Sequence, residues 1–166
     1  LRFVLGVLAG RPADEIEAWR REYIDTVIRP SLNAEALALV KKHLDAGDLC
    51  VIVTATNAFV TRPIAGLFGV QHLLGAEGEV KDGRYTGEPQ GTITFQAGKL
   101  VRLREWLQEQ GLTPDDFDEI WAYSDSRNDL PMLEMATHPV ATNPDPVLRQ
   151  TATVRGWPII DLFPLA

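Results

Sequence analysis

The stretch Leu49–Thr54 constrains the fold more than any other part of this sequence. It reads LCVIVT, a continuous run of apolar and β-branched residues without polar alternation. A strand with one solvent-facing side would alternate, so this pattern is typical of a strand buried on both faces, as in a parallel sheet covered by helices. Helical patterns flank it over 33–47 and 57–68. The chain is therefore expected to be an α/β protein with a parallel sheet.

Predicted strands and helices continue to alternate along the rest of the chain. Further strands are expected at 70–74, 119–123, 139–141 and 157–160, and helices at 99–110, 130–136 and 146–151. The dipeptide Asp82-Gly83 supplies the positive φ angles of a tight turn, so residues 79–86 should form a β-hairpin. In parallel α/β sheets, ligands bind at the carboxyl ends of the strands. Polar residues that follow these strands are therefore the candidates for a functional site.

The first 29 residues carry helical patterns with no strand between them. One helix is expected over 2–10 and a second over 12–29. The apolar stripe of the second consists of Ile16, Trp19, Tyr23 and Val27. Residues 2–10 could instead form the core of a short signal peptide, although their length and charged leader fall short of that pattern. Because the chain opens with Leu1 and not Met, we expect residues to precede it in the complete protein.

The composition narrows the function classes. The 16 Lys and Arg residues against 23 Asp and Glu residues give a formal net charge of −7. Without a cluster of basic residues to neutralise phosphates, nucleic-acid binding is not expected. The longest apolar run is too short to cross a bilayer, so no membrane association is expected. Cys50 is the single cysteine, which excludes a disulfide framework and favours a reducing, cytoplasmic compartment.

The first polar cluster, Thr54-Ala55-Thr56-Asn57, follows the most apolar strand and leads into a helix. A hydroxyl group together with backbone N–H groups at a helix N-terminus forms a site for an anion such as phosphate. The alternative is local, because Thr56 or Asn57 could simply cap the helix that follows.

The second cluster, Tyr123–Asp129, follows a later strand and holds two carboxylates, Asp125 and Asp129. Neighbouring carboxylates repel each other, and a hard divalent cation such as Mg²⁺ relieves that repulsion. Alternatively, Asp129 is a helix N-cap and Asp125 a turn residue. The third candidate is Lys99, which begins a helix and there opposes the helix dipole, so another interaction is expected to require it. Otherwise it is a solvated surface lysine.

Taken in this order, the three clusters resemble a known family. A strand ending in Thr54, Lys99 opening a helix, and Ser124-Asp125-x-x-Asn128-Asp129 after a later strand resemble motifs II, III and IV of the haloacid-dehalogenase-like (HAD) superfamily. The closest likeness is to its phosphoserine-phosphatase-like branch, to which the hairpin at 82–87 is also similar.

The resemblance spans residues 31–162 and implies a fold. Residues 31–166 would form a Rossmann-like parallel sheet flanked by helices, the core of the HAD fold. Residues 1–30 would be the C-terminal part of the small α-helical cap that this branch inserts after motif I.

The sequence departs from the family pattern at its start. Family members begin with a central strand ending in Asp-x-Asp-x-Thr, and none of the 166 residues forms that motif. Without it, the expected sheet lacks a central strand. We therefore interpret the chain as a fragment or truncated form of a larger phosphatase. The residues Thr54-Ala55-Thr56 stand where the branch has Ser-Gly-Gly, and Ser124 and Ser126 stand in place of glycines. These changes alter the space and the amide geometry around the substrate, so the resemblance does not by itself assign phosphoserine as the substrate.

The resemblance implies a Mg²⁺-dependent phosphomonoester hydrolase that acts on a small phosphorylated metabolite through an aspartyl-phosphate. The nucleophilic Asp would lie outside this chain. The implied roles are metal binding by Asp125, substrate binding by Thr54, Ala55, Lys99 and Asn128, and catalysis by Thr54, Lys99 and Asp129. Asp129 would orient Lys99 or a metal-bound water.

Two other function classes and one related enzyme activity stay open. A truncated, inactive pseudo-phosphatase would bind Mg²⁺ or a partner without chemistry. A phospho-receiver domain also combines acids, a Thr and a Lys around Mg²⁺, but receivers carry the acids first, whereas here the order is Thr, Lys, acids. A phosphotransferase of the same superfamily would differ mainly in the acceptor that its cap admits.

Overall fold

The computed structural model of the chain describes residues 11–82, 84–91 and 97–163. The expected helix or signal-peptide core at 2–10 and Gly83 of the predicted turn lie outside these residues. The chain divides into two compact units, residues 1–94 and 95–166. Each unit has its own three-stranded sheet with parallel pairing, which confirms the expected α/β class.

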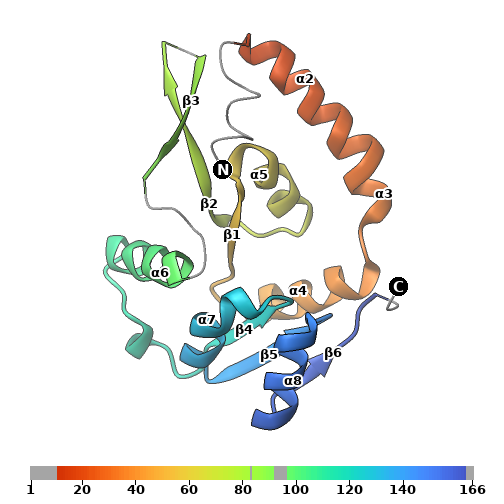
Figure 1. Ribbon diagram of the computed structural model, residues 1–166, viewed down its shortest axis with the longest axis vertical. Coiled ribbons are helices and arrows are strands. Elements are labelled where there is room, and N and C mark those ends of the chain that lie inside the picture. The colour runs from red at the N-terminus through yellow and green to blue at the C-terminus, as the bar shows by residue number, and fades with distance from the viewer. Residues whose placement is uncertain (1–10, 83, 92–96, 164–166) are drawn as a thin grey trace. The chain divides into compact units, whose positions relative to one another are not determined.

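The sheet of the first unit consists of β1 (Val51–Asn57), β2 (His72–Lys81) and β3 (Arg84–Gln90). β1 and β2 are parallel, and β2 and β3 form the long antiparallel hairpin seen in Figure 1. Asp82, with a φ of 50°, confirms the predicted tight turn. The expectation of a separate strand at 70–74 is wrong, because β2 continues unbroken into the hairpin. Gly75 and Gly78, between the expected strand and the expected hairpin, are part of β2.

The helices of the first unit are α2 (Ala13–Tyr23), a π-helical turn (Ile24–Ile28), α3 (Arg29–Ser31), α4 (Ala34–Ala46) and α5 (Ala58–Leu67). The helical segment does not end at Arg29 as expected. Pro30 follows the π-helical turn and lies in the first turn of α3, where a missing N–H costs little. Of the predicted apolar stripe only Ile16 is buried, whereas Trp19, Tyr23 and Val27 are exposed.

The second unit contains α6 (Ala97–Glu109), a 3₁₀ turn (Pro114–Asp116), β4 (Trp121–Ser124), a second 3₁₀ turn (Arg127–Asp129), α7 (Leu130–Met135), β5 (His138–Thr142), α8 (Pro146–Arg155) and β6 (Ile159–Ile160). The three strands pair in chain order and are parallel. α7 and α8 lie beside this sheet in Figure 1. A small core holds the unit together, formed by Leu133, Ala141, Leu148 and Ala152, all fully buried.

Several expected boundaries in this unit are wrong, and β4 begins at Trp121, two residues after the expected start at 119. The helix that begins at Pro146 runs to Arg155, four residues beyond the expected end at 151, and stops at Gly156, whose φ of 68° ends the helix. The last strand, expected over 157–160, is reduced to Ile159–Ile160. Pro158 has no N–H to donate to a ladder, which shortens the strand.

Both sheets leave an edge open within the described parts of the chain. There, β1 pairs only with β2, and β4 pairs only with β5. None of the helices described is both long and apolar enough to span a membrane.

Candidate functional site

An ion pair between Lys99 and Asp129 forms the centre of the candidate site in the second unit. Lys99 is the third residue of α6, and its Nζ lies 2.7 Å from Oδ1 and 2.8 Å from Oδ2 of Asp129. The two side chains are 14% and 7% exposed. The pair explains why a lysine stands at a helix N-terminus, since the carboxylate offsets the unfavourable interaction with the dipole. Asp129 occupies the N-cap position of α7, as the alternative interpretation predicted, but its side chain makes no capping hydrogen bond there.

Ser124 adds a further hydrogen bond to this carboxylate. Its Oγ donates to Oδ2 of Asp129 at 2.7 Å and accepts from the N–H of Ser126 at 3.1 Å. Ser126 in turn caps the 3₁₀ turn by accepting from the N–H of Asn128 at 3.2 Å. A continuous series of hydrogen bonds therefore fixes the loop after β4 around the buried carboxylate.

A further aspartate, Asp145, holds the same loop from the other side. Its N–H donates to the carbonyl oxygen of Asp125 at 2.7 Å, and its Oδ2 accepts from the N–H of Arg127 at 2.7 Å. Its Oδ1 caps α8 through the N–H groups of Val147 and Leu148. Burial acts to raise the pKa of this carboxyl, but the three amide hydrogen bonds and the charge of Arg127 outweigh it and leave the pKa lowered.

Asp125 is the residue in this loop best suited to bind a cation. It directly follows β4 and is exposed. No group of three or more His, Cys, Asp or Glu side chains among the described residues is arranged to hold a metal. Mg²⁺ is commonly held by one or two carboxylates together with waters and substrate phosphates. Asp125 therefore fits the role of one ligand.

Thr54 and Ala55 belong to the first unit and lie within β1, shortly before α5 begins at Ala58. The β1–β2 register jumps from Val53↔Leu74 to Asn57↔Ala76. Three residues of β1 thus face the single residue Gly75 of β2, and the segment bulges out of regular pairing. Bulges re-aim side chains and interrupt the ladder next to functional sites. The hydroxyl oxygen of Thr54 accepts from the N–H of Thr56 at 3.1 Å.

The end of this bulge is anchored to α5. Asn57 is 4% exposed, and its Oδ1 accepts from the N–H of Phe59 at 2.8 Å. Asn57 is therefore the N-cap, as the alternative interpretation of this cluster predicted. Capping leaves the first-turn geometry of α5 available for an anion, so the two interpretations are compatible.

Some of the predicted site residues lie close together in the structure, and two further residues hold the site in place. Lys99 and Asp129 are in direct contact, and Asp125 and Asn128 lie in the same loop. Sequence reasoning did not assign roles to Ser124 and Asp145. The signal for Asp145 was the Asp-Pro pair that opens α8, an N-cap followed by a first-turn proline.

Comparisons with known proteins extend these observations. A model of the haloacid dehalogenase-like hydrolase family matches residues 1–134. A histidinol-phosphatase of Neisseria meningitidis is 38% identical over 162 residues, which cover 97% of this chain and 73% of the relative. A phosphoserine phosphatase of Mycobacterium tuberculosis is 36% identical over 96% of this chain, but the match covers only 51% of that relative.

Solved structures give the same fold. A protein of unknown function from Bordetella pertussis Tohama I is 54% identical, with a TM-score of 0.96 over 98% of this chain and 73% of that protein. A substrate-bound phosphoserine phosphatase has a TM-score of 0.64 at 21% identity, covering 96% of this chain and 69% of the other. At that identity the likeness concerns the fold alone.

Proposed function

Because this chain belongs to the haloacid dehalogenase-like hydrolase family, we propose that it hydrolyses phosphomonoesters with the aid of Mg²⁺ and through an aspartyl-phosphate. The observation that carries the proposal is the buried contact between Lys99 and Asp129. Burial of a charged pair costs desolvation free energy, and only a pair with excellent geometry offsets that cost. A buried pair therefore suggests a function beyond stability. A cation fixed in this way can stabilise negative charge that develops on a phosphoryl group.

Lys99 would neutralise the charge on the phosphoryl oxygens in the transition state. Both carboxylate oxygens of Asp129 contact its ammonium group, and Ser124 fixes the carboxylate. The ammonium group is therefore positioned before substrate arrives, which avoids the cost of reorganisation during reaction. Asp129 acts through Lys99 in this proposal, and Asn128 in the same loop would contact the substrate phosphate.

Thr54 and Ala55 would bind one phosphoryl oxygen through a hydroxyl and a backbone N–H. The bulge after Val53 and the N-terminus of α5 support this role. A helix N-terminus favours an anion because its N–H groups and its dipole both face the bound charge.

Asp125 would provide a carboxylate ligand for Mg²⁺, which offsets the repulsion between an anionic nucleophile and an anionic substrate. The hydrogen bonds of Asp145 to the backbone of Asp125 and Arg127 support a fixed position for that ligand. Only one ligand comes from the described loop, so the proposal requires further ligands from substrate, water or other residues.

The nucleophile of this proposal lies outside the 166 residues. Its carboxylate oxygen would form a bond to phosphorus while the phosphorus–oxygen bond to the alcohol breaks, and a general acid, also outside these residues, would protonate the leaving oxygen. The same group, now a base, would take a proton from the water that attacks phosphorus, which releases inorganic phosphate and the free carboxylate. The open edge of β1 is compatible with a further strand beside it, and residues 1–30 would belong to a helical cap.

The substrate class we propose is a phosphomonoester of a small amino alcohol or hydroxy amino acid, handled in the cytoplasm. The support is that two relatives are named histidinol-phosphatase and phosphoserine phosphatase. Both names describe a phosphate ester on a short carbon chain that carries an amino group.

Phosphate release from a panel of such esters tests the proposal. The protein would be expressed from its complete coding sequence and assayed with Mg²⁺ and with EDTA, and beryllofluoride would serve as a mimic of the acyl-phosphate. Hydrolysis that needs Mg²⁺, together with a rise in Tm on adding beryllofluoride and Mg²⁺, is the expected result. Binding of Mg²⁺ without hydrolysis and without a beryllofluoride effect would instead identify a pseudo-phosphatase.

A further inference from the structure

We propose that Arg20 is a positioning residue that fixes the phosphate-binding turn by supplying a hydrogen bond that Pro63 removes from α5. This inference rests on the proposed function, because the phosphate-binding turn is the bulged segment 54–57 of β1, in which Thr54 and Ala55 are assigned above to phosphate binding. Arg20 lies on α2, in the segment before β1, and contacts the first turn of α5 directly.

Pro63 creates a defect in α5. Within a helix the carbonyl of residue i accepts from the N–H of residue i+4. The partner of the Phe59 carbonyl would be residue 63, which is a proline inside the helix and has no N–H. Phe59 is partly buried, and a carbonyl that is partly removed from water and has lost its partner carries a free-energy cost, so another donor is expected.

Arg20 supplies that donor from a segment 39 residues away. Its Nη1 donates to the carbonyl oxygen of Phe59 at 3.1 Å, and its guanidinium carbon lies 4.2 Å from the centre of the Phe59 ring. Its Nη2 donates to Oε1 of Glu17 at 2.6 Å, and its side chain is 23% exposed. The guanidinium group is thus held by a carbonyl, a ring and a carboxylate, which fixes its orientation.

Phe59 links Arg20 to the phosphate-binding turn. The N–H of Phe59 donates to the side chain of Asn57, the last residue of the bulge. On its other side, the Phe59 ring contacts the ring of Tyr85 edge-on at 5.9 Å. The first turn of α5 is therefore held between α2 and the hairpin, and a shift of Phe59 moves Asn57 with it.

This arrangement predicts a specific functional consequence. If Arg20 acts on the turn, its loss weakens binding of the phosphate group itself and does so equally for every ester. A residue that contacts the leaving group would instead affect some esters and leave inorganic phosphate unaffected. A residue with only a structural role would lower Tm and leave phosphate affinity unchanged.

The test uses Arg20→Ala, Pro63→Ala and the double variant in the protein expressed from its complete coding sequence. Calorimetry measures the Kd of inorganic phosphate, and kinetics measures KM for p-nitrophenyl phosphate and for a small amino alcohol phosphate. Arg20→Ala should raise Kd and both KM values by the same factor, about tenfold, within the range that misplacement of a site residue causes. In the double variant, the N–H restored at position 63 satisfies the Phe59 carbonyl, so most of the loss should be recovered.

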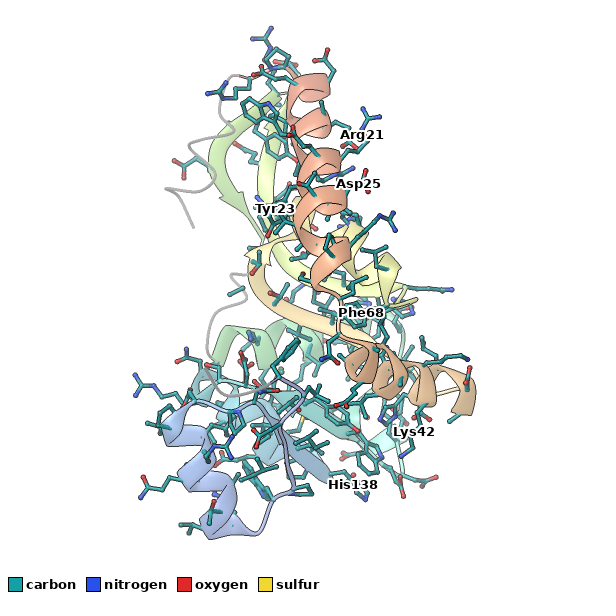
Figure 2. The ribbon with its side chains drawn as sticks, turned by 90° about the vertical axis from the view of Figure 1, so that its right-hand side faces the viewer. Arg21, Tyr23, Asp25, Lys42, Phe68 and His138 are labelled. Carbon is teal, nitrogen blue, oxygen red and sulfur yellow. The ribbon has the colours of Figure 1, made fainter. Side chains whose placement is uncertain are left out.

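Arg21→Ala is the matched control. Arg21 is the next residue on α2, is exposed, and projects outward from the helix in Figure 2. Its removal should leave Kd and KM unchanged.

Three outcomes would overturn the inference. They are an unchanged phosphate Kd in Arg20→Ala, unequal effects on the two esters, or a loss that Pro63→Ala does not recover. Absence of turnover in the wild type, with the phosphate Kd responding as described, would overturn the proposed hydrolysis alone. If the wild type does not bind phosphate, both proposals fail.

Discussion

Lys99 and Asp129 stand 30 positions apart in the sequence, and the ammonium nitrogen of one lies within 2.8 Å of both carboxylate oxygens of the other. The contact joins the start of α6 to the loop after β4. The candidate function requires these two segments to lie next to each other, beside the same phosphate group. Because both side chains are little exposed, loss of one partner should have a large effect on the free energy of unfolding. Removal of one member leaves an uncompensated charge, which is far more costly than breaking a pair in water.

We expect Lys99→Ala to lower kcat by ~10²–10³, the effect of losing one well-placed stabilising group. The free energy of unfolding should fall by about 3 kcal/mol, because Asp129 is left buried without its cation. Lys41→Ala is the control. Its partner is Asp45 at 2.6 Å, with side chains 70% and 63% exposed, so it should lose under ~0.5 kcal/mol. Equal destabilisation by the two variants, measured by urea unfolding, would contradict this account.

Gly75 permits the close approach of β2 to α5. A Cβ added to Gly75 would lie 3.0 Å from both Cα and Cβ of Ala58, a residue with no exposed surface. Gly75→Ala should therefore destabilise the protein by about 1–3 kcal/mol through overpacking. It should also weaken phosphate binding, since Gly75 faces the bulge.

Gly66→Ala is the control for that change, because a Cβ there meets nothing within 4 Å. Gly66 is the last residue but one of α5, and replacing it by alanine should stabilise the protein by about 0.4–1 kcal/mol. Thermal unfolding of both variants would reveal the opposite signs, and a stabilising Gly75→Ala would show that the helix and strand are not in close contact.

Asn57 and Asn33 are matched N-caps that differ in their surroundings. The side chain of Asn33 accepts from the N–H of Ala36 at 2.9 Å at the start of α4, and that of Asn57 accepts from Phe59 at the start of α5. Replacing either by alanine should cost about 1 kcal/mol. Only Asn57→Ala should also raise the KM for phosphomonoesters. Steady-state kinetics on both variants checks this, and a similar KM change in Asn33→Ala would argue against a special role for the turn.

Asp145 should make stability depend on pH. Its pKa is lowered in the folded protein, because amide hydrogen bonds and Arg127 outweigh the burial that acts to raise it. The charged form therefore stabilises the fold at neutral pH. That contribution is lost as the pH falls below about 4, the ordinary range of Asp, and through the lowered pKa.

Asp145→Asn tests this because asparagine can still cap α8 but cannot carry the charge. The Tm difference between wild type and variant should be greatest near pH 7 and shrink towards pH 3. A difference that is constant across this range would contradict a lowered pKa for this carboxyl.

Much of this arrangement follows from local sequence signals. The Asp82 turn and the helix between Asn33 and Gly47 confirm predictions that depend on residues close together in the chain. The β-branched run before Thr54 does form a parallel strand, but the strand spans Val51–Asn57 and its residues up to Thr54 are only partly buried, so the prediction of burial on both faces is wrong. Lys99 was predicted to need a partner because it opposes a helix dipole. Its partner was named only through family resemblance, since no local rule connects residues 30 positions apart.

The features that the sequence did not predict depend on contacts between distant elements. Gly75 lies against Ala58, a contact between a strand and a helix that no local sequence pattern predicts. Ser124 read as a replacement for a family glycine, and its bond to Asp129 became visible only with the loop in place. The donor to the Phe59 carbonyl is on another helix, so no sequence pattern around Pro63 predicts Arg20 as that donor.

The position of Pro63 also affects how the first unit folds. Helix α5 cannot complete its own hydrogen bonding from local residues, because one of its carbonyls depends on Arg20. Formation of this helix and its docking against α2 are therefore coupled, and an isolated peptide spanning 57–68 would gain little helicity in water. A segment of this kind acquires its order late, together with the loop closure that brings α2 to it.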